Sequence, residues 1–160
     1  MNPDGYEIAR VGDEGSLIGR NNAHNMDLNR NFPDQYGVNE YNRKQEPETL
    51  AVMEWSKTNS FVLSANLHGG ALVANFPFDD SAKDFSSNPD PKTEMNPTEE
   101  NDIFKYLAST YATAHRTMYQ GKPCPSFIRE SFPEGITNGA DWYAVTGGMP
   151  DWSYLHGGTY

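Results

Sequence analysis

The sequence lacks three features that would each fix a class of protein. It has no apolar run that approaches the roughly 18 residues of a membrane-spanning helix, so no membrane segment is expected in this chain. It has no lysine- or arginine-rich run, and its formal net charge of −10 would repel a phosphate backbone, which excludes nucleic acid as the expected partner. Cys124 is the single cysteine, so no disulfide can form within the chain.

What is present is the composition of a folded protein with many loops. A length of 160 residues suffices for the core of one domain, and it would also fit a part of a larger one. Aromatic residues at 12% and hydrophobic residues at 36% argue against disorder, while 14 glycines and 11 prolines indicate many turns. Residues 1–5 do not form a signal peptide. We therefore expect a globular, loop-rich, enzyme-like body.

Two segments have the periodicity and the start signals of helices. The first covers residues 46–57, with Pro47 near its first position. The second covers residues 96–118, with Asn96 as the cap and Pro97 in the first turn. The apolar residues expected to face the core are Leu50, Met53 and Trp55 in the first helix, and Ile103, Leu107, Tyr111 and Ala114 in the second.

Two apolar runs, over residues 61–67 and 71–76, are expected as buried strands. A histidine and two glycines separate them, so His68 would lie at a strand end, where α/β proteins usually place their chemistry. The remaining segments are rich in glycine, proline, asparagine and aspartate. They predict a turn at residues 2–5, a functional loop region to about residue 42, and loops over residues 78–96 and 120–139.

Residues 19–22 (GRNN) and 27–34 (DLNRNFPD) place two arginines within an amide-rich cluster. Arginine presents a planar fork of donors that matches a carboxylate, and asparagine adds a neutral donor that fixes orientation. The segment therefore indicates a receptor for an anionic group such as a carboxylate. The alternative is that Arg20 and Arg30 are solvated or form weak ion pairs, as most surface arginines do.

Further motifs follow in series along the whole chain. They are residues 2–5 (NPDG), 67–71 (LHGGA), 75–80 (NFPFDD), 135–140 (GITNGA), 142–143 (WY) and 147–149 (GGM). Together with the arginine and asparagine motifs, they resemble the zinc metallocarboxypeptidases, most closely the carboxypeptidase D, E, N and M branch.

The resemblance implies a three-layer α/β fold with a mixed, mostly parallel sheet flanked by helices. Residues 1–160 would form a partial peptidase domain, truncated at both ends, with an incomplete sheet. In the family, a zinc ion polarises the scissile carbonyl and activates water, and a glutamate acts as the general base. His68 matches a zinc ligand of the family, for which a strand end followed by a glycine pair is a suitable place.

The resemblance also implies roles for residues that bind the substrate. Arg20 matches the arginine that stabilises the developing oxyanion, and Asn29 with Arg30 matches the pair that holds the terminal carboxylate. Tyr143 matches the tyrosine that closes over the substrate, although it could instead be a half-buried core aromatic. Asp79 matches the acidic residue that favours a terminal lysine or arginine, although it could also be an ordinary loop carboxylate.

The sequence departs from the family pattern in three ways. A catalytic zinc needs about three protein ligands, yet the His-X-X-Glu motif is absent, and we expect it before Met1. The general base is expected beyond Tyr160, and Pro150 stands where the branch usually has a glutamine. The other acidic and histidine candidates are read as coincidental, structural or solvated: His24 with Asp27, His115, His156, Glu130 and Glu134. The chain as given is expected to bind zinc weakly and to be inactive.

Two further hypotheses stand beside the carboxypeptidase. The chain could be a non-catalytic module that binds peptide C-termini, or an extracellular interaction domain that has lost the metal site. The expected partners are the C-termini of peptides or proteins. The resemblance places the protein outside the cell or in the secretory pathway, although no targeting signal is seen in the chain.

Overall fold

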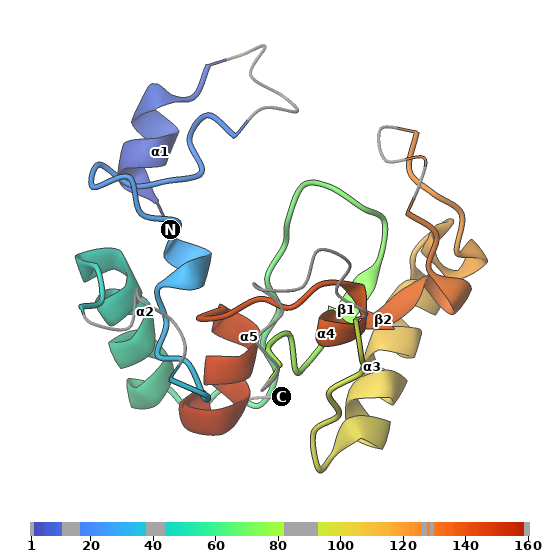
Figure 1. The fold of residues 1–160 in the computed structure, drawn as a ribbon. Helices are drawn as coiled ribbons and strands as arrows, with labels where there is room; N and C mark the ends of the chain where they lie inside the picture. The colour runs from blue at the N-terminus through green and yellow to red at the C-terminus, as the bar shows by residue number, and fades with distance from the viewer. Residues whose placement is uncertain are drawn as a thin grey trace. The chain divides into compact units, whose positions relative to one another are not determined.

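The computed structural model describes residues 2–10, 17–37, 44–81, 93–125, 128 and 130–158. These residues form two compact units. The first unit comprises Met1–Val62 and Thr146–Thr159, and the second comprises Leu63–Val145. In Figure 1 the first unit contains the blue to cyan helices and the red α5, while the second contains the small sheet and the yellow α3.

The first unit is helical in its described part. Its elements are α1 (Pro3–Ile8), the short 3-10 turn η1 (Leu28–Arg30), α2 (Pro47–Thr58), α5 (Met149–Trp152) and the π-turn η5 (Ser153–Gly157). Phe32 and Trp152 are buried at its centre, with their ring centroids 5.5 Å apart. The Nζ atom of Lys57 lies 5.7 Å from the Trp152 ring centroid, so α2 contributes a cation–π contact to this core.

The expected turn over residues 2–5 is instead the start of α1. The Asn2 side chain accepts a hydrogen bond from the Gly5 backbone N–H, and Pro3 occupies the first helical position. Asparagine at the cap and proline at the first position favour a helix as well as a turn, so the motif by itself was ambiguous.

The helix expected over residues 46–57 is confirmed as α2, but its buried side was wrong. Thr49 and Ser56 are buried, whereas Leu50 and Trp55 are exposed. Thr49 and Ser56 are two helical turns apart and so share a face of the helix. Leu50 and Trp55 lie outside that face. The Trp55 ring packs against Phe61 instead, with centroids 4.7 Å apart.

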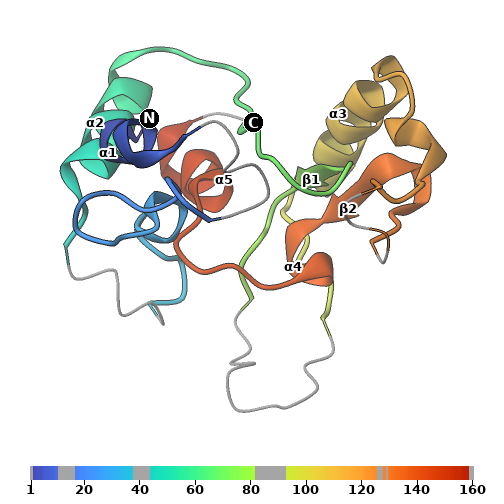
Figure 2. The same cartoon turned by 90° about the horizontal axis from the view of Figure 1, so that it is seen from above.

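The second unit contains a two-stranded parallel sheet. Its elements are β1 (Ala74–Phe76), α3 (Asn101–Ala114), η3 (Met118–Gln120), η4 (Pro133–Gly135), β2 (Ile136–Asn138) and α4 (Gly139–Trp142). The strands pair in the register Ala74 to Ile136 and Phe76 to Asn138. The α3 helix packs against both strands, as Figure 2 shows from above.

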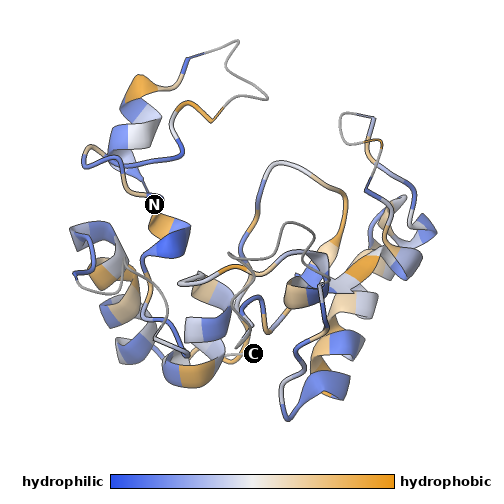
Figure 3. Cartoon of the chain, viewed as in Figure 1, coloured by the Kyte–Doolittle hydropathy of each residue, from blue (hydrophilic) through white to orange (hydrophobic). Residues whose placement is uncertain are grey.

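The face of α3 that is buried lies one residue away from the expected one. Phe104, Ala108 and Ala112 are buried at a spacing of four residues, while Ile103 and Tyr111 are exposed. In Figure 3 hydrophobic and hydrophilic residues alternate around α3, so the helix is amphipathic and the periodicity alone left the face uncertain by a residue.

Both ends of the expected helix over residues 96–118 were also wrong. The helix begins at Asn101 with Glu100 as its N-cap, whereas the side-chain amide of Asn96 donates to the Asp80 carbonyl. It ends at Ala114, where His115 leaves the helical conformation and its Nδ1 atom accepts hydrogen bonds from the Thr117 and Met118 backbone N–H groups. Side chains that bond to nearby backbone compete with helix propagation.

The strand predictions were confirmed only for Ala74–Phe76. Residues 61–67 are not a strand, and β2 formed within a segment that was expected to be a loop. A strand needs a neighbouring strand for its backbone hydrogen bonds, which local sequence does not specify. The α/β class is confirmed, whereas a third layer and a mixed sheet stay predictions, since the described residues show one parallel pair.

Two further expectations concern exposure and membranes. The loop over residues 78–96 was expected to be exposed, but Asp79 and Asp80 are 5% and 2% exposed. Residues 82–92 of that loop, like residues 11–16 and 38–43 of the N-terminal loop region, lie outside the described residues. Among the helices that the structure describes, none has the length and hydropathy to span a bilayer.

Candidate carboxylate-binding site

Arg20 lies at one end of a tight turn that is closed by Asp27. The backbone of Asn21 and Asp27 forms an antiparallel bridge, and Asn22 donates its N–H to the Met26 carbonyl at 3.0 Å. Across this turn, Nε of Arg20 donates to Oδ2 of Asp27 at 2.7 Å. In the described part of the chain, the hydrogen bond of the Arg20 guanidinium is made by Nε. Its two terminal nitrogens are therefore available to a ligand.

The start of α1 supports the backbone beside Arg20. The Nδ2 atom of Asn2 donates to the carbonyls of Gly19 and Arg20, at 3.2 and 3.0 Å. A Cβ at Gly5 would lie 2.0 Å from the Gly19 carbonyl oxygen, so a glycine is required for this approach. The Asn-Pro-Asp-Gly motif therefore caps a helix and also holds the arginine segment.

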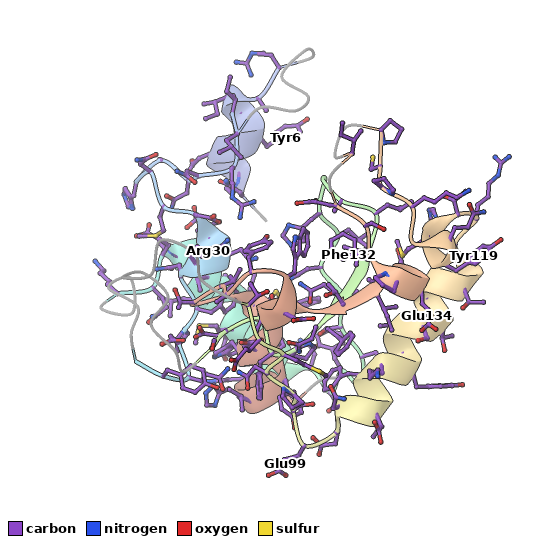
Figure 4. The ribbon with its side chains drawn as sticks, turned by 45° about the vertical axis from the view of Figure 1, so that its right-hand side comes forward. Tyr6, Arg30, Glu99, Tyr119, Phe132 and Glu134 are labelled. Carbon is purple, nitrogen blue, oxygen red and sulfur yellow. The ribbon has the colours of Figure 1, made fainter. Side chains whose placement is uncertain are left out.

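The η1 turn carries Asn29 and Arg30, which Figure 4 shows for the labelled Arg30. Oδ1 of Asp27 accepts the Asn29 backbone N–H at 3.0 Å and so caps this turn. Oδ1 of Asn29 accepts the Met149 backbone N–H at 3.0 Å, which orients the amide and leaves Nδ2 as its donor. Nη1 of Arg30 donates to the Asn29 carbonyl at 2.8 Å.

A buried polar cluster fixes the chain that follows η1. Asn31 is fully buried, and its side chain accepts from the Glu46 N–H at 2.6 Å and donates to the Lys44 carbonyl at 3.2 Å. The Glu46 carboxylate accepts from Asn22 Nδ2 at 2.9 Å and pairs with His24 Nδ1. The hydrogen bond from Asn22, followed by that from His24, lowers the pKa of Glu46. His24 thus contacts the Glu46 carboxylate through its Nδ1 atom.

In the second unit, Asp79 lies just beyond the carboxyl end of β1. Its carbonyl accepts the Val145 N–H at 2.8 Å, and the preceding Phe78 carbonyl accepts the Ala140 N–H at 3.0 Å. A Cβ at Gly139 would lie 1.8 Å from Asp79 Oδ1, so a glycine is required there. Asp79 is buried rather than exposed, and its assignment to the pocket for a terminal lysine or arginine stays a prediction.

Two asparagines hold the same loop from the side of β2. Oδ1 of Asn138 accepts the Asn96 N–H at 3.0 Å, and Nδ2 of Asn138 donates to the Asn96 carbonyl at 3.1 Å. Nδ2 of Asn96 in turn donates to the Asp80 carbonyl at 2.6 Å. The Phe78 N–H also donates to the Asn96 carbonyl at 3.0 Å, so these bonds connect the end of β2 to the backbone on either side of Asp79.

Tyr143 follows α4 as its C-cap and is 47% exposed. Its ring meets Trp142 edge to face at a centroid distance of 4.8 Å, and Trp142 meets the buried Phe132 in the same way at 5.0 Å. The aromatic chain thus runs from a buried ring outward to Tyr143. Tyr143 is thus the partly exposed end of this aromatic chain, and its role at a substrate stays a prediction.

His68 does not lie at a strand end, because it precedes β1 by several residues in an exposed segment without regular structure. Among the described residues, no group of three histidine, cysteine, aspartate or glutamate side chains is arranged to hold a metal ion. These residues therefore do not by themselves fit a complete zinc site, which needs about three protein ligands.

The other residues set aside in the sequence have mainly local roles. His115 bonds to backbone as described above, and His156 is exposed on η5. Glu134 is exposed on η4, as Figure 4 shows, with a φ of 60°. Cys124 is free and partly exposed.

The structure brings Arg20, Asn29 and Arg30 together within the first unit. Asp79, Tyr143 and His68 belong to the second unit. Sequence reasoning missed three supporting residues, namely Asn2, Asp27 and Gly139. The signals for the first two were present, because an asparagine before proline and an aspartate two residues before Asn29 are both typical of helix caps.

The comparisons with known proteins agree with the motifs. The family described as zinc carboxypeptidase matches residues 1–160. Carboxypeptidase D of Drosophila melanogaster is 56% identical over 99% of this chain, and carboxypeptidase D of Homo sapiens is 50% identical over 97%. The carboxypeptidase N catalytic chain of Rattus norvegicus is 45% identical over 98%. The matched region covers 12%, 11% and 37% of these three relatives, respectively.

Proposed function

Because the chain belongs to the zinc carboxypeptidase family, we propose that it is part of a metallocarboxypeptidase that removes the C-terminal residue from peptides. Residues 1–160 would form part of the peptidase domain. The observation that carries the proposal is that one carboxylate, Asp27, holds both Arg20 and Asn29, next to Arg30, with the terminal nitrogens of Arg20 and Nδ2 of Asn29 left for a ligand.

Asn29 and Arg30 are proposed to recognise the terminal carboxylate of the substrate. The Asn29 amide is oriented by Met149, so its Nδ2 group offers a fixed neutral donor beside a cation. A carboxylate gains short, charge-assisted hydrogen bonds from such a pair. An internal peptide bond carries no such charge, and this difference would restrict the enzyme to chain ends.

Arg20 is proposed to act at the scissile carbonyl. Its side chain is 35% exposed, and its Nε atom is held by Asp27 while the terminal nitrogens remain available. A fixed cation that faces an oxygen on which negative charge develops stabilises the transition state more than the ground state. Arg20 would therefore affect kcat more than KM.

Asp79 and Tyr143 are proposed to serve the side-chain pocket for the terminal residue. A buried carboxylate favours a cationic lysine or arginine side chain, which would compensate its charge. Pro150, where the branch usually has a glutamine, offers no side-chain hydrogen bond, so Asp79 would carry this preference. Tyr143, exposed at the end of α4, would close over the bound residue.

The family implies a zinc ion, and His68 is proposed as one ligand. The described residues do not complete the site, so the roles assigned to this chain are those of binding and orienting the peptide. Peptide and protein C-termini are the proposed partners. The proposed location, extracellular or within the secretory pathway, rests on the resemblance to the carboxypeptidase D and N branch.

A non-catalytic module that binds peptide C-termini is the second candidate. It is favoured by the contacts that hold Arg20 and Asn29, because these come from Asp27 and Met149, which both belong to the first unit. Such a module would bind a peptide with a free carboxylate without cleaving it.

The test uses the longest natural product that contains this sequence, with an N-blocked dipeptide ending in arginine. Arg30→Ala should lower kcat/KM by a free-energy equivalent of roughly 2–4 kcal/mol, about 30- to 1,000-fold, because a charged partner of the carboxylate is lost. The matched control is Arg116→Ala, which removes an exposed arginine outside the site.

Three outcomes are distinct. An unchanged kcat/KM in Arg30→Ala would refute the assignment of Arg30. Binding of the free peptide without release of arginine, together with no binding of the C-terminally amidated peptide, would favour the binding module. Neither binding nor hydrolysis by the wild type would refute both candidates.

A further inference from the structure

The carboxylate of Asp27 contacts two residues to which the proposed function gives separate roles, namely the guanidinium of Arg20 and the backbone of Asn29. Its Oδ2 atom accepts from Arg20 Nε at 2.7 Å, and its Oδ1 atom accepts from the Asn29 backbone N–H at 3.0 Å. Arg20 is assigned to the scissile carbonyl and Asn29 to the terminal carboxylate. In a substrate these two groups belong to the last two residues, since the scissile carbonyl is that of the penultimate residue.

The turn between Arg20 and Asp27 makes this double contact a built feature. The backbone bridge between Asn21 and Asp27 places the side chains of Arg20 and Asp27 at the open end of the turn. The closed end is fixed by Asn22, whose Oδ1 atom accepts the backbone N–H groups of His24 and Met26, at 3.1 and 3.0 Å. The backbone of Asp27 is therefore held in place by the turn, independently of the contacts that its side chain makes with Arg20 and Asn29.

We propose that Asp27 is a positioning residue that sets the spacing between the Arg20 guanidinium and the Asn29 amide, and so matches the spacing between the scissile carbonyl of the penultimate residue and the carboxylate of the terminal residue. This inference rests on the proposed function. An arginine side chain has many rotamers, and its Nε contact with Asp27 removes much of that freedom before the substrate arrives. The hydrogen bond from the Asn29 backbone N–H holds the residue that carries the side-chain amide against the same carboxylate.

The two oxygens can be tested separately. In Asp27→Asn, Oδ1 can still accept the Asn29 N–H, but an amide nitrogen in place of Oδ2 cannot accept from Arg20 Nε. Asp27→Ser likewise keeps an oxygen that can cap η1 and loses the contact with Arg20. Asp27→Ala loses both contacts.

The assay is hydrolysis of the N-blocked dipeptide ending in arginine by the longest natural product that contains this sequence. Asp27→Asn and Asp27→Ser should each lower kcat by about tenfold or more with KM within about twofold, because the Arg20 role lies in the transition state. Asp27→Ala should lower kcat and also raise KM by about fivefold or more, since the cap on Asn29 is lost. Asp102→Asn, which makes the same charge change at an exposed position on α3, is the matched control and should leave both constants unchanged.

A readout without turnover keeps the test valid if a variant is less stable. The side-chain Nε–H of Arg20 in a ¹⁵N NMR spectrum should show slow exchange in the wild type, and fast exchange in Asp27→Asn and Asp27→Ser. If Asp27 had only a structural role, its substitutions would lower kcat and thermal stability together. The three variants would then not differ in how the loss of activity divides between kcat and KM.

The inference and the proposed function fail in different ways. An active wild type in which Asp27→Asn has unchanged kcat, or lowers kcat with no effect on the Arg20 Nε–H, would overturn the role of Asp27 alone. A wild type that neither hydrolyses the dipeptide nor binds N-blocked arginine would overturn the proposed function.

Discussion

The arginine–asparagine segment (residues 19–32) and the Asp79 loop (residues 77–81) are held in different ways. In the first, polar side chains make hydrogen bonds to backbone: Asn2 donates to the Arg20 carbonyl, and Asn22, Asp27 and Asn29 accept backbone N–H groups. In the second, backbone groups from residues about 60 positions away bond to the loop, and Gly139 lets them approach. The first arrangement depends on particular polar side chains, and the second depends on the absence of a side chain at Gly139.

The difference shows which changes each region tolerates. A polar side chain in the arginine–asparagine segment can be replaced by another that offers the same atom at the same place. The Asp79 loop has no such freedom at Gly139, since any added atom meets both the side chain and the backbone of Asp79. The following substitutions test this contrast.

Gly139→Ala should have the largest effect. The added Cβ would lie 1.8 Å from Asp79 Oδ1 and 2.8 Å from Asp79 Cα, so the backbone must move, and we expect a loss of about 1–3 kcal/mol in the free energy of unfolding. Urea unfolding of the chain measures it. The matched control is Gly69→Ala, which has no heavy atom within 4 Å and should change stability by less than about 0.5 kcal/mol. Equal effects at both glycines would contradict the contrast.

Asn2→Ala should have an intermediate effect. It removes the cap of α1 and the two hydrogen bonds to the Gly19 and Arg20 carbonyls, so the expected loss is about 1 kcal/mol in urea unfolding. Asn2→Asp keeps the acceptor for the Gly5 N–H but loses both donors. If the cap dominates, the aspartate variant should recover most of the stability, and if it recovers none, the contacts with the arginine segment are the important ones.

The smallest effect concerns pH. The pKa of Glu46 is lowered by its hydrogen bonds with Asn22 and then His24, so its contribution to stability is present above the unfolded-state pKa and is lost as the pH falls through the lower folded-state pKa. A carboxyl-detected NMR titration should place the midpoint of Glu46 below the ordinary value for a glutamate. His24→Ala should raise that midpoint, and a midpoint that does not respond would show that the His24 contact is not formed in solution.

Sequence reasoning succeeded where the signal was local. The α2 helix was predicted to within one residue because Pro47 marks its start, and β1 was found within its apolar run. The arginine–asparagine segment was predicted as a site because its donors are close together in the chain, and this stays a prediction. Reasoning failed for the strand at residues 61–67, for β2 and for the exposure of Asp79, since each depends on a partner that is distant in sequence.

The roles of individual residues divide in the same way. The sequence by itself determined the family, the local turns and the residue types that suit a carboxylate, because these are properties of short segments in a fixed order. Only the tertiary structure decided that Asp27 contacts both Arg20 and Asn29, and that Gly139 makes room for a buried Asp79. The physical reason is that hydrogen-bond partners and excluded volume are set by distances in space, which sequence separation does not give.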